Sequence, residues 1–220
     1  MLVFIHGGYW RSLDKSDFSF LAPAYNAQGI DVAIINYGLA PSTPLHDICL
    51  QTVRAIAWLY SQQIQFGFDP GNITVAGHSA GGHLAAMAFC AHWQSILRHD
   101  TGDYLPANLI KKAFALSGIF DLEPIRLTPF LNDAIRLSAD QATTISPVCF
   151  GQPKKGKILT MVGEFESAQF HHQSRLLHEA WPARAPKPQT MAGCNHLTIC
   201  SELGDPQSTV SKALVDLIRS

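Results

Sequence analysis

The stretch that decides the fold is residues 73–88, ITVAGHSAGGHLAAMA. Residues 73–76 form an apolar run with β-branched side chains, which is typical of a buried strand, and the leucine and alanines after Gly82 are typical of a helix. Gly-x-Ser-x-Gly lies between them, with Ser79 at its centre. A serine at a sharp turn between strand and helix has a strained backbone, and flanking glycines remove side chains that would clash. The stretch therefore predicts Ser79 as a nucleophile at the N-terminus of a helix.

The rest of the chain repeats this alternation of strand and helix. Apolar runs predict buried strands at residues 2–5, 32–35, 73–76, 113–116, 158–162 and, more weakly, 189–191. Apolar residues at three- and four-residue spacing predict helices over 45–60 and 170–181, and a last helix after Asp205 with Pro206 near its first turn. Strands that alternate with helices favour an α/β fold with a mostly parallel central sheet flanked by helices.

The length and composition indicate one domain. The chain has 220 residues, of which 47% are hydrophobic, and it contains no repeat or linker that would divide it. We therefore expect a single domain over residues 1–220. Residues 120–153 break the alternating pattern with prolines and mixed polarity, and we interpret them as an excursion over the active-site edge of the sheet.

Charge and motif content exclude several classes of function. The net charge of −1 gives no broad positive field for nucleic acid or anionic lipid. No apolar stretch approaches the ~20 residues that span a bilayer, so we expect a cytoplasmic protein without membrane contact. The five cysteines lack CxxC spacing and the histidines form no HExxH motif, so we expect reduced thiols and no metal site.

A second glycine-rich loop follows the first predicted strand. His6-Gly7-Gly8 precedes the serine motif in the chain, where a hydrolase of this architecture needs its second oxyanion donor. We predict an oxyanion hole made of the backbone N–H groups of Gly7, Gly8 and Ala80, with His6 bracing the loop. Losing one such donor typically costs a factor of about 100 to 1,000 in rate.

Chain order selects the general base and its carboxylate. Serine, acid and histidine follow in that order in this architecture, so we predict His196, in the loop before the last helix, as the base. The acid must follow the penultimate strand, where Glu164 and Glu166 are equally placed, and Asp121 is a third possibility or a helix cap. We expect the other late histidines, His171, His172 and His178, to lie on the solvated surface of a helix.

These motifs together resemble the kynurenine formamidase (arylformamidase) group of α/β-hydrolases, neighbours of the hormone-sensitive-lipase esterases. The resemblance covers nearly the whole chain and rests on HGGYW, NYGLAPSTPL, GHSAGGHLAAM, SGIFDLEPI, VGEFESAQFHHQS and GCNHL. In the family, the residue before the serine of the ESxxFxxQS run is the triad acid, usually aspartate. The match lands on Glu166, so the resemblance favours Glu166 over Glu164.

The resemblance implies hydrolysis of the formyl amide of N-formylkynurenine by a Ser-His-Glu triad, with no cofactor. Tyr9 and Trp10 are expected to line the substrate site as an aromatic wall or to anchor the loop as core residues, and His78 is also expected to contact substrate. The alternatives are a carboxylesterase on short acyl esters, which needs the same triad, and an inactive truncated relic or binding protein.

The resemblance also implies that two strands usual for the fold are absent before residue 2. The strand over residues 32–35 would then be an exposed sheet edge. An open edge of this kind favours pairing with a second chain, so we count a homodimer among the expected partners besides the small-molecule substrate.

Overall fold

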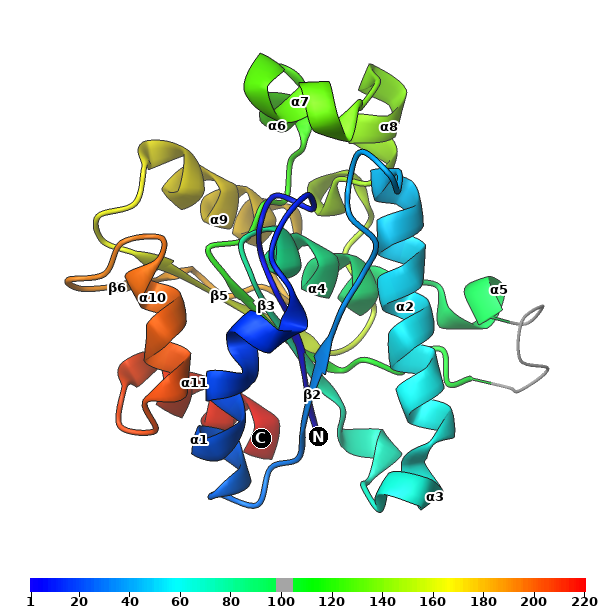
Figure 1. Cartoon of the computed structure of the whole chain (residues 1–220), viewed down its shortest axis with the longest axis vertical. Coiled ribbons are helices and arrows are strands. Elements are labelled where there is room, and N and C mark those ends of the chain that lie inside the picture. The colour runs from blue at the N-terminus through cyan, green and yellow to red at the C-terminus, as the bar shows by residue number, and fades with distance from the viewer. Residues whose placement is uncertain (98–104) are drawn as a thin grey trace.

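A six-stranded parallel sheet forms the centre of the computed structural model, which describes residues 1–97 and 105–220 (Figure 1). The strand order is β2-β1-β3-β4-β5-β6, and every neighbouring pair is parallel. The strands are β1 Leu2–Ile5, β2 Val32–Ile35, β3 Thr74–His78, β4 Lys112–Leu116, β5 Lys157–Gly163 and β6 Gln189–Met191. All six predicted strands are present, with ends that differ from the predictions by at most two residues. The predicted α/β fold is confirmed.

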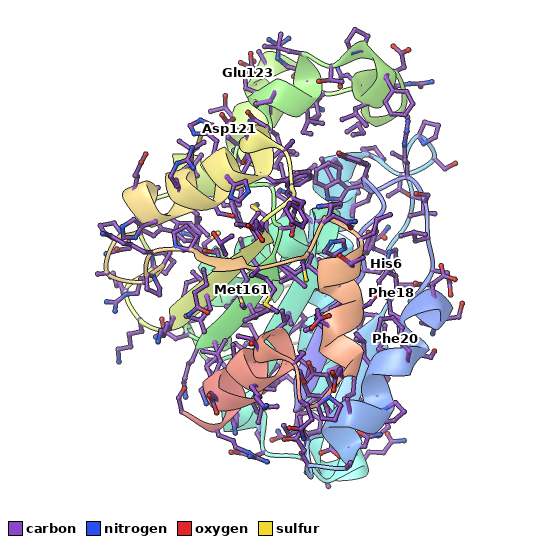
Figure 2. The ribbon with its side chains drawn as sticks, turned by 90° about the vertical axis from the view of Figure 1, so that its left-hand side faces the viewer. His6, Phe18, Phe20, Asp121, Glu123 and Met161 are labelled. Atoms are coloured by element: carbon purple, nitrogen blue, oxygen red, sulfur yellow. The ribbon has the colours of Figure 1, made fainter. Side chains whose placement is uncertain are left out.

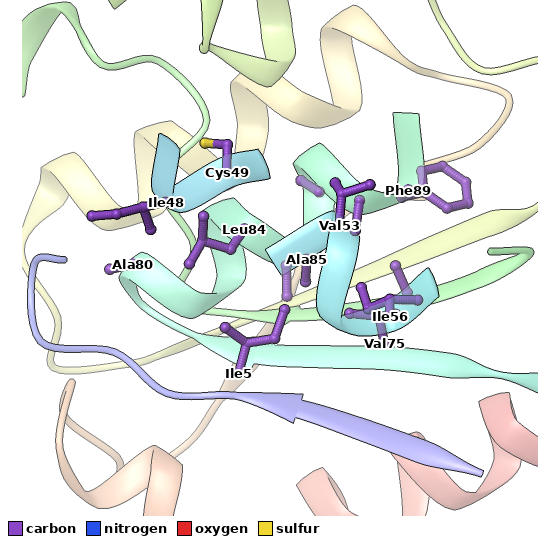
Figure 3. Close-up of a cluster of buried hydrophobic side chains, with 14 of the residues drawn as sticks. Ile5, Ile48, Cys49, Val53, Ile56, Val75, Ala80, Leu84, Ala85 and Phe89 are labelled. Atoms are coloured by element: carbon purple, nitrogen blue, oxygen red, sulfur yellow. The ribbon is translucent and has the colours of Figure 1, made fainter. Parts of the chain in front are cut away.

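Both faces of the sheet are covered by helices, which explains why the strands are continuous apolar runs. In β1, Val3 and Ile5 belong to one buried cluster, whereas Leu2 and Phe4 belong to the other. Figure 3 shows side chains of the first cluster, between the sheet and the helices α2 (Leu45–Ser61) and α4 (Ala80–Cys90). Helix α9 (Ala168–Ala180) also covers this face. Helices α1 (Ala22–Asn26), α10 (Thr198–Ser201) and α11 (Thr209–Arg219) cover the other.

The helix predictions were correct in position but not always in boundary. The apolar stripe of α2 faces the sheet, as its periodicity indicated. The last helix begins later than predicted, and Pro206 lies outside it. Ser208 is the N-cap residue of α11, and its hydroxyl accepts the backbone N–H of Ser211. A side-chain cap of this kind sets a helix start more strongly than a proline does. Outside residues 120–153, the other short helices are η1 Lys15–Leu21, α3 Gln63–Phe66, η2 Pro70–Asn72, α5 Trp93–Leu97 and η4 Glu202–Gly204.

Residues 120–153 form a group of short helices at one end of the molecule (Figure 1). We call this group the cap: α6 (Glu123–Arg126), α7 (Pro129–Ile135), α8 (Ala139–Thr144) and η3 (Pro147–Cys149). Gln173 of α9 anchors the base of the cap, because its side-chain oxygen accepts the backbone N–H groups of Phe120 and Asp121 at 2.7 and 2.8 Å.

Strand β2 is the outermost strand at one side of the described sheet. It pairs with β1 alone, and Val32, Ala33 and Ile34 are only half-buried. The described part of the chain holds no helix with the length and apolarity needed to cross a membrane.

Candidate active site

Ser79 occupies the turn between the last residue of β3 and the first residue of α4. Its φ of 56° lies in the left-handed region, a backbone conformation that L residues rarely adopt. A methyl group on Gly77 would collide with the carbonyl oxygen of Gly81, and one on Gly81 would collide with the carbonyl oxygen of Ile5. The backbone therefore packs around this turn too closely for any residue but glycine at positions 77 and 81.

A continuous chain of hydrogen bonds joins Ser79, His196 and Glu166. Nε2 of His196 is 3.0 Å from Oγ of Ser79, and Nδ1 is 2.7 Å from Oε2 of Glu166. Because an ionised carboxylate can only accept, Nδ1 carries the proton, and Nε2 is left to accept the serine hydroxyl. The arrangement has the geometry of nucleophile, base and orienting acid.

Glu166 is held by its other oxygen as well. Oε1 accepts the hydroxyl of Ser117 at 2.5 Å and the backbone N–H of Gly163 at 2.7 Å. The Glu166 side chain is fully buried, which by itself would raise its pKa. The hydrogen bonds from His196, Ser117 and Gly163 outweigh that burial and lower the pKa below its ordinary value. The carboxylate is therefore ionised at neutral pH.

The other two acids considered from the sequence have different partners. Glu164 is exposed, and its carboxylate accepts the backbone N–H of Gly193 at 2.8 Å. Asp121 accepts the backbone N–H of Glu123 at 3.0 Å, at the start of α6, and both residues belong to the cap (Figure 2). Of the three acids, Glu166 is therefore the one that the fold brings to His196.

The loop after β1 lies directly against Ser79. A methyl group on Gly7 would be 3.2 Å from Cβ of Ser79, so the two backbones are in contact. Among the described residues, the N–H groups of Gly7 and Gly8 donate to no backbone or side-chain acceptor. Ala80, as the first residue of α4, has an N–H without an intrahelical partner. These three donors therefore have no partner among the described residues, and Gly7 and Ala80 lie directly beside Ser79.

Side chains from other elements brace this loop. Nδ1 of His6 lies 2.9 Å from the carbonyl oxygen of Gly7, and the hydroxyl of Tyr37 lies 2.9 Å from the carbonyl oxygens of both His6 and Gly7. The His6 ring is stacked between Tyr37 and Phe18, at centroid distances of 4.4 and 5.9 Å. Figure 2 shows His6 and Phe18 together on this side of the molecule. His6 therefore contacts the loop rather than the nucleophile.

The three residues expected to contact substrate differ in exposure. Tyr9 is half-buried, whereas Trp10 is completely buried with its indole edge-on to His83 at 5.2 Å. The burial of Trp10 favours the loop-anchoring interpretation over the aromatic wall. His78 is only 6% exposed, and its Nε2 is 2.8 Å from the carbonyl oxygen of His196. Substrate contact by Tyr9 and His78 stays a prediction.

Sequence reasoning missed two residues that contact Glu166 or His196. Ser117 follows β4 directly, has a φ of 51° and is completely buried beneath Glu166. Phe170 of α9 stacks on the imidazole of His196, with ring centroids 4.2 Å apart. The position of Ser117 after a buried strand was a usable signal, because the carboxyl ends of parallel strands meet at one edge of a sheet. For Phe170, helical periodicity indicated only a core residue.

The late histidines do not gather into a metal site. Nδ1 of His178 is 2.8 Å from the carbonyl oxygen of Ala185, a local contact at the end of α9. Within residues 1–97 and 105–220, no three His, Cys, Asp or Glu side chains are grouped so that they could hold a metal ion.

The sheet order and this site define the chain as a hydrolase of the α/β-hydrolase class. The esterase of Pyrobaculum calidifontis has the same fold, with a TM-score of 0.76 over 99% of this chain and 76% of the esterase, at 19% identity. The BD-FAE family matches residues 1–181, and the chain belongs to the BD-FAE family.

Two proteins with a higher sequence identity show more narrowly what the chain is related to. A protein from Silicibacter sp. TM1040 is 31% identical in sequence. Its crystal structure matches this chain with a TM-score of 0.79, over 100% of this chain and 75% of that one. The kynurenine formamidase of Danio rerio is 28% identical over 225 residues, which cover 99% of this chain and 72% of that protein. The resemblance inferred from the sequence motifs is confirmed: the chain is kynurenine formamidase-like.

Proposed function

We propose that this protein is a serine hydrolase that cleaves the formyl amide of N-formylkynurenine. The observation that carries the proposal is the unbroken chain from Ser79 through His196 to Glu166, beside three free backbone donors. The similarity to kynurenine formamidase along almost the whole chain supports this substrate.

The first half of the proposed reaction transfers the formyl group to the enzyme. Oγ of Ser79 attacks the formyl carbon while Nε2 of His196 takes the hydroxyl proton. The N–H groups of Gly7, Gly8 and Ala80 stabilise the oxyanion that forms. The C–N bond then breaks as His196 gives its proton to the aryl nitrogen, which releases kynurenine and leaves formyl-Ser79.

The second half restores the free enzyme. His196 takes a proton from water as the water oxygen attacks the formyl carbon, and the proton returns to Oγ of Ser79 when formate leaves. Glu166 stays ionised throughout, because three hydrogen bonds and the positive imidazolium all favour its charged form. The site therefore needs no metal or cofactor for either step.

Turnover of N-formylkynurenine by purified protein tests the proposal. We expect release of kynurenine, measured by absorbance, that Ser79→Ala abolishes while circular dichroism shows the variant folded. Thr198→Ser, outside the proposed triad, serves as a control for substitution near the His196 loop. Folded wild-type protein without turnover would contradict the proposed substrate.

Short acyl esters are the second candidate substrates. The same nucleophile, base and oxyanion donors cleave esters as well as formamides. Parallel measurement of kcat/KM on p-nitrophenyl acetate decides between them: a large preference for the ester would indicate a carboxylesterase. Absence of fluorophosphonate labelling at Ser79 in the folded protein would contradict both and favour a binding protein.

A further inference from the structure

One histidine beside the nucleophile is not used by the mechanism above. His78 is the last residue of β3, immediately before Ser79, and its side chain is buried. Its Nε2 lies 2.8 Å from the backbone carbonyl oxygen of His196. Because a carbonyl oxygen can only accept, Nε2 of His78 must carry a proton and donate it to that bond.

This hydrogen bond joins two segments whose relative position must be fixed for the proposed reaction. Ser79 belongs to the turn between β3 and α4, whereas His196 lies in the loop between β6 and α10. Much of that loop is at the surface, because Gly193, Asn195 and Leu197 are exposed. A hydrogen bond from the buried side chain of His78 to the backbone of His196 therefore fixes the loop against the turn that carries Ser79.

The ring of His78 also faces the reacting imidazole. The His78 and His196 rings are 4.7 Å apart, and Phe170 stacks on His196 at 4.2 Å. A second positive charge at His78 would repel the imidazolium that forms when Ser79 loses its proton. Burial, and then the nearby His196, lower the pKa of His78 to about 4, so it stays neutral at the pH where the base works.

We propose that His78 is a positioning residue, which holds the backbone of His196 through its Nε2–H so that the imidazole stays in line with Oγ of Ser79. The inference rests on the proposed serine-hydrolase function. His78 then orients the base, whereas the sequence led us to expect that it contacts the substrate.

Two substitutions separate the hydrogen bond from the bulk of the ring. His78→Phe keeps a ring of similar size but has no donor, and His78→Gln has an amide N–H that reaches about as far as Nε2. A displacement of 1 Å at a catalytic group costs up to about 100-fold in rate. For p-nitrophenyl acetate we therefore expect His78→Phe to lower kcat 10- to 100-fold with KM changed less than twofold, and His78→Gln to recover at least fivefold over Phe.

The readouts are chosen to isolate this role. The rate of fluorophosphonate labelling at Ser79 is expected to fall in His78→Phe by the same factor as kcat, because both need an aligned base. His92→Leu, which alters an exposed histidine outside the site, is the matched control and is expected to keep the wild-type rate. A folded Phe variant with kcat within threefold of wild type would overturn the proposal, and so would a raised KM at unchanged kcat.

A measurement on the unmodified protein covers the case in which the Phe variant does not fold. Long-range ¹H–¹⁵N spectra report the tautomer of each histidine, and His78 is assigned by comparison with the Gln variant. We expect His78 to carry its proton on Nε2 and to remain neutral at pH 5.5. A proton on Nδ1 would refute the bond. Absence of fluorophosphonate labelling at Ser79 in the wild-type protein would instead refute the underlying hydrolase function.

Discussion

At the scale of single residues, Glu166 is the carboxylate that the fold places against His196. The Glu166 side chain reaches His196 from the turn that follows β5. Both of its oxygens are occupied, one by His196 and the other by Ser117 and Gly163. The carboxylate is therefore fixed from two sides.

The two neighbouring glutamates give a matched pair of variants. Glu166→Gln keeps the shape of the side chain but loses the charge that holds the His196 tautomer, so we expect kcat to fall by about 10⁴, as for the acid of other serine triads. Glu164→Gln alters an exposed carboxylate and is expected to stay within threefold of wild type. Steady-state kinetics on either proposed substrate measures both. Equal losses in the two variants would contradict the assignment of the acid.

Sequence reasoning identified the residues whose positions depend on local patterns. The elbow around Ser79 could be predicted because its glycines and its strand and helix are adjacent in the chain. Glu166 could not be separated from Glu164 by spacing alone, because two residues apart in a turn are both near the sheet edge. The family resemblance was needed to favour one. Ser117 was missed because its contact with Glu166 depends on the pairing of β4 with β5.

At the scale of elements, the cap is attached differently at its base and at its outer side. The base is tied by buried bonds, from Gln173 to the backbone of Phe120 and from His83 to the carbonyl oxygen of Ile145. The outer side, at α7, is joined to the loop after β1 by Arg11. The guanidinium of Arg11 donates to the carbonyl oxygen of Phe130 at 3.1 Å and lies 4.3 Å above its exposed ring.

Removal of Arg11 is expected to loosen α7 without disturbing the triad. An exposed cation–π contact contributes about 0.5–1 kcal/mol, so in Arg11→Ala we expect amide hydrogen exchange in α7 to accelerate about two- to fivefold. Exchange in α4 is expected to stay unchanged, and Arg11→Lys to be intermediate, because lysine keeps the charge without the planar fork. Acceleration in α4 equal to that in α7 would show general destabilisation instead.

The short cap helices also show where sequence patterns fail. Helices α6, α7 and α8 have four, seven and six residues, too few for an apolar period to repeat. The strands β1, β3, β4 and β5 were found because each is a buried apolar run, whereas β6 is short, largely exposed and gave only a weak signal. Length and burial therefore decided which elements the sequence could reveal.

At the scale of the whole molecule, buried neutral histidines make the fold sensitive to acid. Burial lowers the pKa of His6, and it lowers those of two others further. His78 and His83 are both buried, and burial lowers the pKa of each to about 4. In the unfolded chain their pKa returns to about 6.5, so the unfolded state binds more protons between these values. Protonation therefore favours unfolding as the pH falls from 6.5 towards 4.

Urea unfolding at several pH values measures this effect. With about 1.4 kcal/mol for each pKa unit, each histidine accounts for up to about 3 kcal/mol, and we expect the free energy of unfolding to fall by a few kcal/mol between pH 7 and pH 4.5. His83→Gln removes one titrating group, so its pH dependence is expected to be shallower, whereas His92→Gln is expected to parallel the wild type. A wild-type curve that is flat over this range would disprove the assignment.

The left-handed backbone of the site has a consequence for the residues that occupy it. Tyr9, Trp10, Ser79 and Ser117 all have positive φ values, a conformation that costs non-glycine residues about 1 kcal/mol or more. At Ser79 and Ser117, replacement by glycine relieves that cost but removes the nucleophile or the hydroxyl beneath Glu166. The serines at positions 79 and 117 therefore keep their hydroxyl groups at a cost in backbone conformation that glycine would not pay.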